Sequence, residues 1–324
     1  MSQVVPGVRM VYSEPDPDAD RALIIEADAV EKRFGSVRAL DGANLRVASG
    51  RVVGLIGPNG AGKTTLMKSI VGLIYPDAGT VRVSGQLVNG QTPREMGALV
   101  DRPAFYPYLS GRENLAALAM ARDIDRGRVD QHVKEVLALT GLSAVALRRV
   151  GGYSTGMRGR LAVAAALLGE PRVIVLDEPG SGLDPDGLAE IRRLIADLAV
   201  RRVAVLVSSH LLGEMEQVCD EIAIMSRGRV VAAGPLSGLL GRRTGWELRF
   251  ESGEVAGRAA SLLEPAFQVE ITRETAVWAR PRAIDDRAGS PLKHLSEAGL
   301  LPLEIRETGQ SLEDAYFALT ASPR

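Results

Sequence analysis

Cysteine and long apolar runs are what this chain has least of. Its 324 residues include a single cysteine, Cys219, which excludes an internal disulfide and suits a reducing compartment. No run of about 18 apolar residues occurs, so we expect no segment that spans a membrane. The first residues also lack the basic and then apolar pattern of a signal peptide.

Neither sign of charge is in excess. The chain has 39 Lys and Arg against 40 Asp and Glu. A nucleic-acid binder normally carries a basic excess that matches the phosphate backbone, so we expect no nucleic-acid partner. Aromatic residues are also scarce, at 4% of the chain, and any cluster of them is therefore informative.

One stretch matches the phosphate-binding P-loop pattern G-x-x-x-x-G-K-S/T. An apolar strand is predicted before it, over 51–56, and a helix after it, over 66–71. Glycines let backbone N–H groups approach a phosphate closely, and the helix N-terminus adds positive charge. In this pattern Lys63 reaches the β- and γ-phosphates, and the Thr64 hydroxyl binds Mg²⁺. The predicted nucleotide-binding residues of the loop are Gly57, Pro58, Asn59, Gly60, Ala61, Gly62, Lys63, Thr64 and Thr65.

The rest of the chain divides into regions of different pattern. Residues 1–21 are acidic and punctuated by proline, which predicts a disordered tail. Residues 22–240 are expected to form an α/β domain, with an antiparallel β layer around the P-loop and an inserted helical subdomain over about 96–170. Residues 241–324 have a looser pattern that predicts a small α+β domain.

Two continuous apolar runs predict central parallel strands, over 173–176 and 203–207. The first leads into Asp177 and Glu178, and the second into a serine pair and His210. Open α/β sheets bind ligands at the carboxyl ends of their strands, which argues against a merely solvated turn. We therefore expect Asp177 to bind Mg²⁺, directly or through water, and Glu178 to accept a proton from an attacking water.

A second anion site is predicted at the start of a helix. The segment Tyr153–Arg158 contains a Ser and a Gly just before an apolar helix over 161–168. A P-loop enzyme has little use for two phosphate sites in one subunit. The second site makes sense if it serves a nucleotide held by another copy of the chain.

Together these motifs resemble the nucleotide-binding subunit of an ATP-binding cassette (ABC) transporter, over about 24–233. They occur in that family's order: the P-loop, a loop at Asp101, a signature at 153–158 similar to LSGGQ, Walker B with its glutamate, and a switch histidine. The resemblance implies an α/β P-loop NTPase fold of the ABC ATPase type. It also implies ATP and Mg²⁺ as ligands, and an ATP-dependent homodimer that encloses two ATP molecules.

The resemblance also implies roles for particular residues. Glu178 and His210 are expected to be catalytic, although a lone histidine is more often structural. Nucleotide contacts are expected from Phe34, Ser154, Gly156 and Asp184, and metal ligation from Thr64, Asp101 and Asp177. Phe34 would stack on adenine; the alternative is a phenylalanine of the core.

The finer resemblance is to exporters of the bacitracin and daunorubicin resistance type. It rests on residues 100–107 together with 113–115, on the Gly-Met pair of the signature, and on a C-terminal tail at 312–317 similar to their accessory domain. The chain departs from the family pattern at three positions. Asp101 stands where the family has Gln, or Glu in this subgroup, while Thr155 and Gly159 replace a signature Gly and Gln.

The sequence thus predicts an ATPase that drives a separate membrane permease and that lies in the cytoplasm at the inner face of the membrane. The resemblance implies that this permease exports a drug, an antibiotic or a lipid-like compound. The alternative is a non-transport ABC ATPase, such as a DNA-repair or translation factor; a small-molecule kinase would have no use for the signature segment. A cluster of aromatics, Phe105, Tyr106 and Tyr108, either packs the helical subdomain or forms a permease-docking groove.

Overall fold

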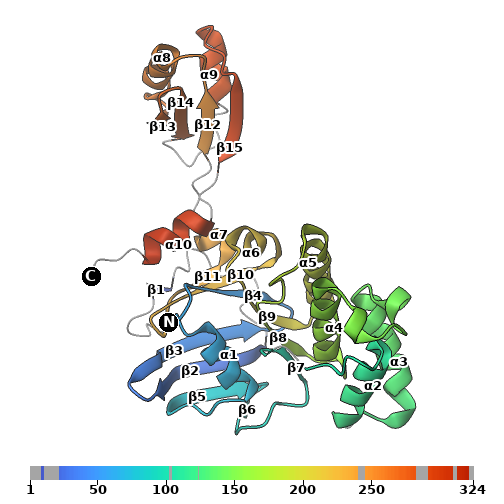
Figure 1. Ribbon diagram of the computed structural model, residues 1–324. Coiled ribbons are helices and arrows are strands. Elements are labelled where there is room, and N and C mark those ends of the chain that lie inside the picture. Colours follow the sequence, from blue (N-terminus) through green and yellow to red (C-terminus); the bar gives the residue numbers. More distant parts are fainter. Residues whose placement is uncertain are drawn as a thin grey trace. The chain divides into compact units, whose positions relative to one another are not determined.

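The computed structural model describes residues 9–10, 22–101, 104–122, 124–239, 245–281, 291–308 and 312–320. The chain divides into two compact units, 1–239 with 318–324, and 240–317 (Figure 1). The tail predicted over residues 1–21 lies outside the described residues except for β1 (Arg9–Met10). Ser311, a candidate helix cap by its residue type and its place before 312–317, also lies outside them.

A seven-stranded sheet forms the centre of the first unit, in the order β1-β11-β10-β4-β9-β8-β7. The strands β4 (Val52–Ile56), β9 (Ala204–Ser208), β8 (Val173–Asp177) and β7 (Met96–Leu99) run in parallel. Their apolar residues are buried on both faces, as expected of central parallel strands. The strands β10 (Glu221–Ser226) and β11 (Arg229–Pro235) pair antiparallel and form a hairpin.

A four-stranded antiparallel layer, in the order β3-β2-β5-β6, accompanies this sheet. Its strands are β2 (Leu23–Phe34), β3 (Val37–Ala48), β5 (Ala78–Val83) and β6 (Gln86–Leu87). Helix α1 (Lys63–Val71) contacts β2, β3 and β5 of the layer and β8 of the sheet. The hydrophobic core therefore includes residues of the antiparallel layer, of α1 and of the central sheet, such as Ile25, Leu40, Leu66 and Val175.

The helical subdomain consists of α2 (Gly111–Ala121), α3 (Arg126–Leu139) and α4 (Thr155–Leu167), with short turns η1 (Ser143–Val145) and η2 (Val150–Gly152). Residues 96–99, which the sequence placed at its start, instead form β7 of the central sheet. Gly97 allows β7 to lie this close to α4, because any other residue would place its Cβ 2.0 Å from the Ala166 carbonyl oxygen. An apolar run of this length is too short for hydrophobic periodicity to distinguish a strand from a helix.

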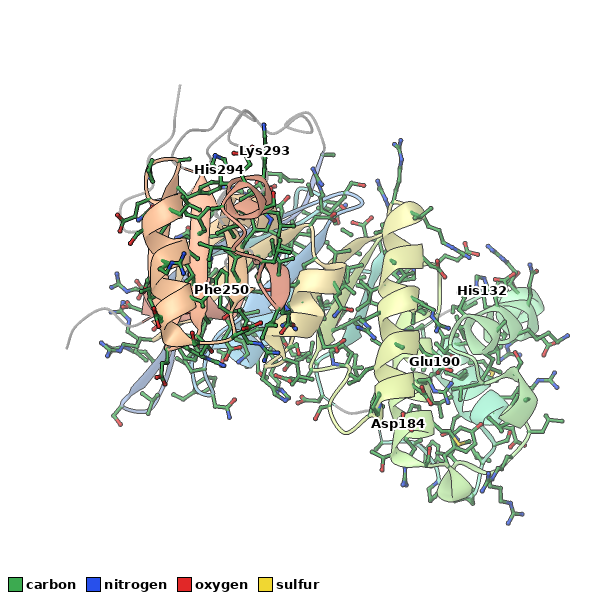
Figure 2. The ribbon with its side chains drawn as sticks, turned by 90° about the horizontal axis from the view of Figure 1, so that it is seen from above. His132, Asp184, Glu190, Phe250, Lys293 and His294 are labelled. Atoms are coloured by element: carbon green, nitrogen blue, oxygen red, sulfur yellow. The ribbon has the colours of Figure 1, made fainter. Side chains whose placement is uncertain are left out.

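Three more helices complete the first unit: α5 (Pro185–Val200), α6 (Leu212–Val218) and α7 (Leu236–Leu239). Figure 2 shows Asp184 at the start of α5 and Glu190 on the same helix. None of the helices formed by the described residues is long and apolar enough to cross a membrane.

The second unit is a small α+β structure. Its sheet has the order β13-β14-β12-β15 and is formed by β12 (Gly245–Arg249), β13 (Phe267–Arg273), β14 (Ala276–Pro281) and β15 (Glu304–Thr308). Helices α8 (Gly253–Leu263) and α9 (Pro291–Glu297) bury a separate core that includes Phe250 and Phe267. The boundary between the two units falls within α10 (Leu312–Thr320), after residue 317.

Candidate nucleotide site

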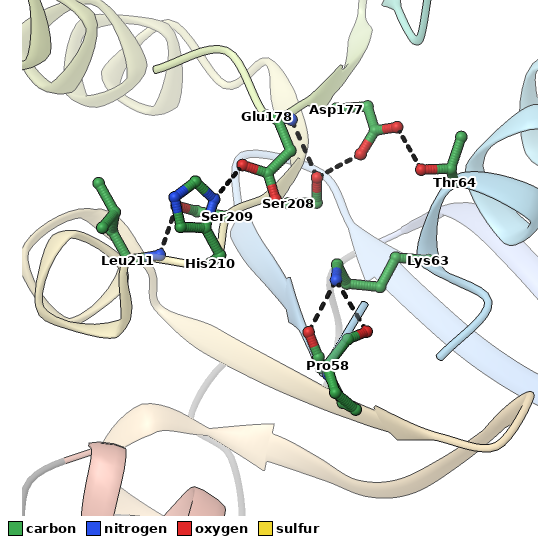
Figure 3. Close-up of polar contacts among 10 residues, drawn as sticks. Pro58, Lys63, Thr64, Asp177, Glu178, Ser208, Ser209, His210 and Leu211 are labelled. Carbon is green, nitrogen blue, oxygen red and sulfur yellow. Dashed lines mark hydrogen bonds and ion pairs between the residues drawn. The ribbon is translucent and has the colours of Figure 1, made fainter. Parts of the chain in front are cut away.

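The P-loop connects β4 to α1 and curls around its own lysine. Lys63 Nζ donates to the carbonyl oxygens of Gly57, at 2.7 Å, and Pro58, at 3.3 Å (Figure 3). An ammonium group has three hydrogens, and these bonds use two of them. Gly62 has φ +106°, and a Cβ there would lie 2.6 Å from the Ala39 carbonyl oxygen. Gly60 faces open space instead, so the tight turn of the loop leaves one side open to a ligand.

Asp177 at the end of β8 is held by hydroxyl groups on both of its oxygens. Thr64 Oγ1 donates to Oδ2 at 2.7 Å, and Ser208 Oγ donates to Oδ1 at 2.5 Å. The parallel register places Asp177 directly opposite Ser208 on β9. The predicted metal ligands Thr64 and Asp177 therefore lie side by side, and the orientation of the carboxylate is fixed (Figure 3).

Glu178 and His210 are also brought together. His210 Nδ1 lies 2.5 Å from Glu178 Oε2, and because a carboxylate accepts, Nδ1 carries the proton. The Glu178 backbone N–H donates to Ser208 Oγ at 3.0 Å, and Glu178 has φ +50°, a left-handed conformation that is uncommon outside glycine. The His210 side chain is 57% exposed, so it is not buried in the core, and its catalytic role stays a prediction.

Asp101 occupies a different environment from Asp177. Its carboxylate pairs with Lys68 Nζ of α1 at 2.9 Å and is 68% exposed. It nevertheless lines a cavity of about 320 Å³ that Asp177 and Glu178 also line. Its role as a metal ligand stays a prediction.

Phe34 ends β2 with 49% of its surface exposed, so the alternative of a core phenylalanine is wrong. Lys32 Nζ lies 5.8 Å from its ring centroid, a cation–π distance that leaves the ring accessible. An exposed ring of this kind is able to stack on a planar base.

The signature residues lie at the start of α4. Ser154 caps this helix by accepting from Met157 N–H at 3.2 Å. A Cβ at Gly156 would be 3.7 Å from the nearest side chain, so packing within the chain does not require glycine there. Tyr153 anchors the segment: its hydroxyl donates to the Val145 carbonyl at 2.8 Å, and burial raises the pKa of the phenol.

Asp184 has a local structural role. Its Oδ1 accepts from Gly187 N–H at 2.9 Å, which caps α5. Contacts of Asp184, Ser154 and Gly156 with a nucleotide held by another copy stay predictions.

Sequence reasoning missed two residues that organise the site. Ser208 is fully buried and its hydroxyl joins Asp177 to the backbone of Glu178. Asn114 is 2% exposed, and its amide bonds both the N–H and the carbonyl of Tyr106, at 2.8 and 3.1 Å. The signal for Ser208 was its place at the end of a predicted strand. Asn114 entered the sequence analysis only within the segment 113–115 of the exporter resemblance, and no contact with Tyr106 was expected of it.

Comparison with known proteins identifies this constellation. Residues 40–181 match the family described as "ABC transporter". The chain is 34% identical to the Bacitracin transport ATP-binding protein BcrA of Bacillus licheniformis, over 91% of this chain and 97% of that protein. It is 35% identical to the Daunorubicin resistance ATP-binding protein DrrA3 of Streptomyces coeruleorubidus, over 94% and 98%.

A solved structure, "Structure of ATP binding subunit of ABC transporter", superposes with a TM-score of 0.60 and 27% identity over 67% of this chain and 91% of that one. The α/β P-loop fold and the finer resemblance to exporter subunits are thus confirmed. The shared family, the near full-length relatives and the P-loop geometry lead to one conclusion: the chain belongs to the ABC transporter family, as an ATP-hydrolysing subunit that works with a membrane permease.

Proposed function

We propose that this protein hydrolyses ATP to power a separate permease that exports a drug, an antibiotic or a lipid-like compound. The observation that carries the ATPase mechanism is the meeting of Lys63, Thr64 and the pair Asp177–Glu178 at the carboxyl ends of β4 and β8. The export of such compounds is supported by two relatives, which are named for bacitracin transport and daunorubicin resistance.

Mg²⁺ fits the donors at this site. The Thr64 hydroxyl and the Asp177 carboxylate are hard oxygen ligands, and they lie 2.7 Å apart. We expect both to hold the ion, with Asp101 as a further ligand, directly or through water. When bound, Mg²⁺ neutralises phosphate charge that builds up during transfer.

The proton chemistry belongs to Glu178 and His210. Glu178 would accept the proton of the attacking water, and such general-base help contributes roughly 10²–10⁴-fold. His210, hydrogen-bonded to the Glu178 carboxylate, would hold it in orientation and contact the γ-phosphate. Lys63 would donate its remaining hydrogen to a phosphate oxygen.

Two copies of the chain are needed to complete each site. Ser154 and Gly156 stand at the exposed N-terminus of α4, where backbone N–H groups and the helix dipole favour an anion. In an ATP-dependent homodimer, this helix end and Asp184 would cover the nucleotide on the other P-loop.

The permease would bind beside the 320 Å³ cavity, which is lined by Asp101, Phe105 and Pro107 as well as by the catalytic carboxylates. Next to it Tyr106 and Tyr108 are 54% and 63% exposed, so packing of the helical subdomain does not explain them. Their ring centroids are 5.7 Å apart, and exposed paired aromatics are typical interface anchors. This would place the protein in the cytoplasm, at the inner face of the membrane.

Glu178→Gln tests the proposal. The amide keeps the shape of the side chain but does not accept the proton, so we expect ATP hydrolysis to fall roughly 10²-fold or more while ATP binding persists. Light scattering should show an ATP-bound dimer that accumulates. Glu297→Gln, an exposed glutamate of α9, is the matched control and should behave as the parent. Turnover within a few-fold of the parent in Glu178→Gln would exclude Glu178 as the base.

A further inference from the structure

A histidine and two glutamates meet away from the nucleotide site, where the helical subdomain adjoins the segment between α4 and β8. His132 and Glu135 are three residues apart on α3, so they share one face of the helix. Glu170 lies on the segment that leads into β8. One ligand atom from each of the three lies within 4.8 Å of the others.

His132 is the unusual member of this cluster. Its side chain is 7% exposed, and among the described residues it has no hydrogen-bond partner. Its recorded polar neighbour is Glu170, with Nδ1 and Oε1 3.9 Å apart, which is too long for a hydrogen bond. The ring lines the same groove as Glu135 and Glu170, so its nitrogens face two carboxylates and are accessible to an ion in that groove. Figure 2 shows His132 in the helical subdomain.

We propose that His132, Glu135 and Glu170 bind a divalent transition-metal ion, with Zn²⁺ as the best match. One imidazole nitrogen and two carboxylate oxygens are a donor set that suits Zn²⁺ and related first-row ions, whereas Mg²⁺ prefers oxygen alone. Ligand atoms about 2.0–2.2 Å from a tetrahedral ion lie roughly 3.3 Å apart. The 3.9 Å separation is close enough that a small side-chain rotation would reach this spacing.

Glu135 and Glu170 each have a carboxylate oxygen that is available to bind an ion. Glu135 accepts from Gln131 through Oε1, and within the described part of the chain its other oxygen makes no hydrogen bond. Arg128 lies 3.6 Å from Glu170 Oε1, beyond hydrogen-bond distance. A purely ionic cluster of Arg128, a protonated His132 and Glu170 is the competing explanation, and it predicts no metal binding.

The ion would fasten α3 to the segment that enters β8, the strand that ends in Asp177. It therefore acts as a structural clamp between the helical subdomain and the central sheet. This proposal is independent of the proposed export function.

The test uses the full-length chain, stripped of metal with a chelator and dialysed, then titrated with Zn²⁺ by calorimetry and with Co²⁺ by its visible absorption. We expect one ion per chain at this site and a higher melting temperature in Zn²⁺. Glu170→Gln and Glu135→Gln should each weaken binding on the order of tenfold or more. Both residues are exposed, so these variants avoid the folding risk of altering His132. Asp197→Asn, an exposed acid that lines the same groove outside the cluster, is the matched control and should bind as the parent.

A Glu178→Gln variant separates this site from the nucleotide site, where His210 and Glu178 could also attract Zn²⁺. Binding that survives Glu178→Gln but weakens in Glu170→Gln supports the clamp. Absence of binding, binding unchanged in both cluster variants, or binding abolished by Glu178→Gln would overturn it.

Discussion

Ser208 holds the Asp177 carboxylate and the backbone of Glu178 in place, and its removal should affect stability and metal-dependent nucleotide binding together. The hydroxyl is fully buried, donates to Asp177 Oδ1 and accepts from Glu178 N–H. A hydrogen bond to a charged group contributes about 1.5–3 kcal/mol and one between neutral groups about 0.5–1.5 kcal/mol. Ser208→Ala should therefore destabilise the first unit by roughly 2–4 kcal/mol, which corresponds to a fall in Tm of roughly 5–15 °C.

The same change should weaken the metal site. Asp177 keeps its bond from Thr64 but loses the bond that fixes its other oxygen, so its carboxylate can rotate. If half of the roughly 2–4 kcal/mol came from keeping the carboxylate in its binding orientation, the affinity for Mg²⁺-nucleotide should fall about tenfold. Titration with a fluorescent ATP analogue should show this loss in Mg²⁺ and little change in EDTA.

Ser69→Ala is the matched control for Ser208→Ala. Ser69 is 1% exposed and its hydroxyl donates to the Thr65 carbonyl at 3.0 Å, a single neutral bond within α1. It should cost about 1 kcal/mol and leave the Mg²⁺ dependence as it was. Equal Mg²⁺ dependence in the two variants would refute the claim that Ser208 orients Asp177.

Three further outcomes are expected. Gly156→Asp should abolish hydrolysis but leave ATP binding by the monomer intact, because the new side chain fits within its own chain and would crowd only the nucleotide bound by a second copy. Gly257→Asp, on a helix with open space around it, is the control. Normal turnover in Gly156→Asp would argue against the two-copy site. Tyr106→Ala and Tyr108→Ala should weaken capture of the permease in a pull-down while ATP binding barely changes. A fully retained complex in both variants would rule out an interface role. Cys219 is 7% exposed, and burial raises the pKa of its thiol to about 12. At pH 8 only about one molecule in 10⁴ then carries the thiolate, so alkylation of Cys219 should require unfolding. Fast labelling of the folded chain would contradict this.

Local patterns account for what could be predicted from the sequence. The P-loop is contiguous over 57–65 and sits between a strand and a helix, so its pattern carries its own structural context. Asp177 and His210 follow apolar runs, and the ends of neighbouring parallel strands must lie near one another. The convergence of these side chains follows from that rule, whereas the ABC ATPase fold is what the family resemblance implied.

Contacts that depend on register could not be predicted in this way. Ser208 and Ser209 look alike in sequence, and only the pairing of Asp177 with Ser208 shows which hydroxyl faces the carboxylate. The Lys68–Asp101 pair joins α1 to a loop 33 positions away, and an exposed pair of this kind has no pattern in the sequence. Because Lys68 neutralises Asp101, the departure from Gln at this position is partly offset in charge.

A contact of Asn114 changes how the loop that carries Tyr106 and Tyr108 is interpreted. Scarcity of aromatics made Tyr106 and Tyr108 conspicuous, but it did not separate core packing from an exposed surface. Their exposure alone could reflect a loosely held loop. Asn114 argues against that, because its buried amide bonds the N–H and carbonyl of Tyr106 and the carbonyls of Leu109 and Ser110. The backbone is therefore fixed from below while the rings stay exposed, and a preorganised aromatic pair binds a partner at a smaller cost in conformational entropy than a mobile one. Asn114 thus makes the docking hypothesis more specific than the tyrosines could on their own.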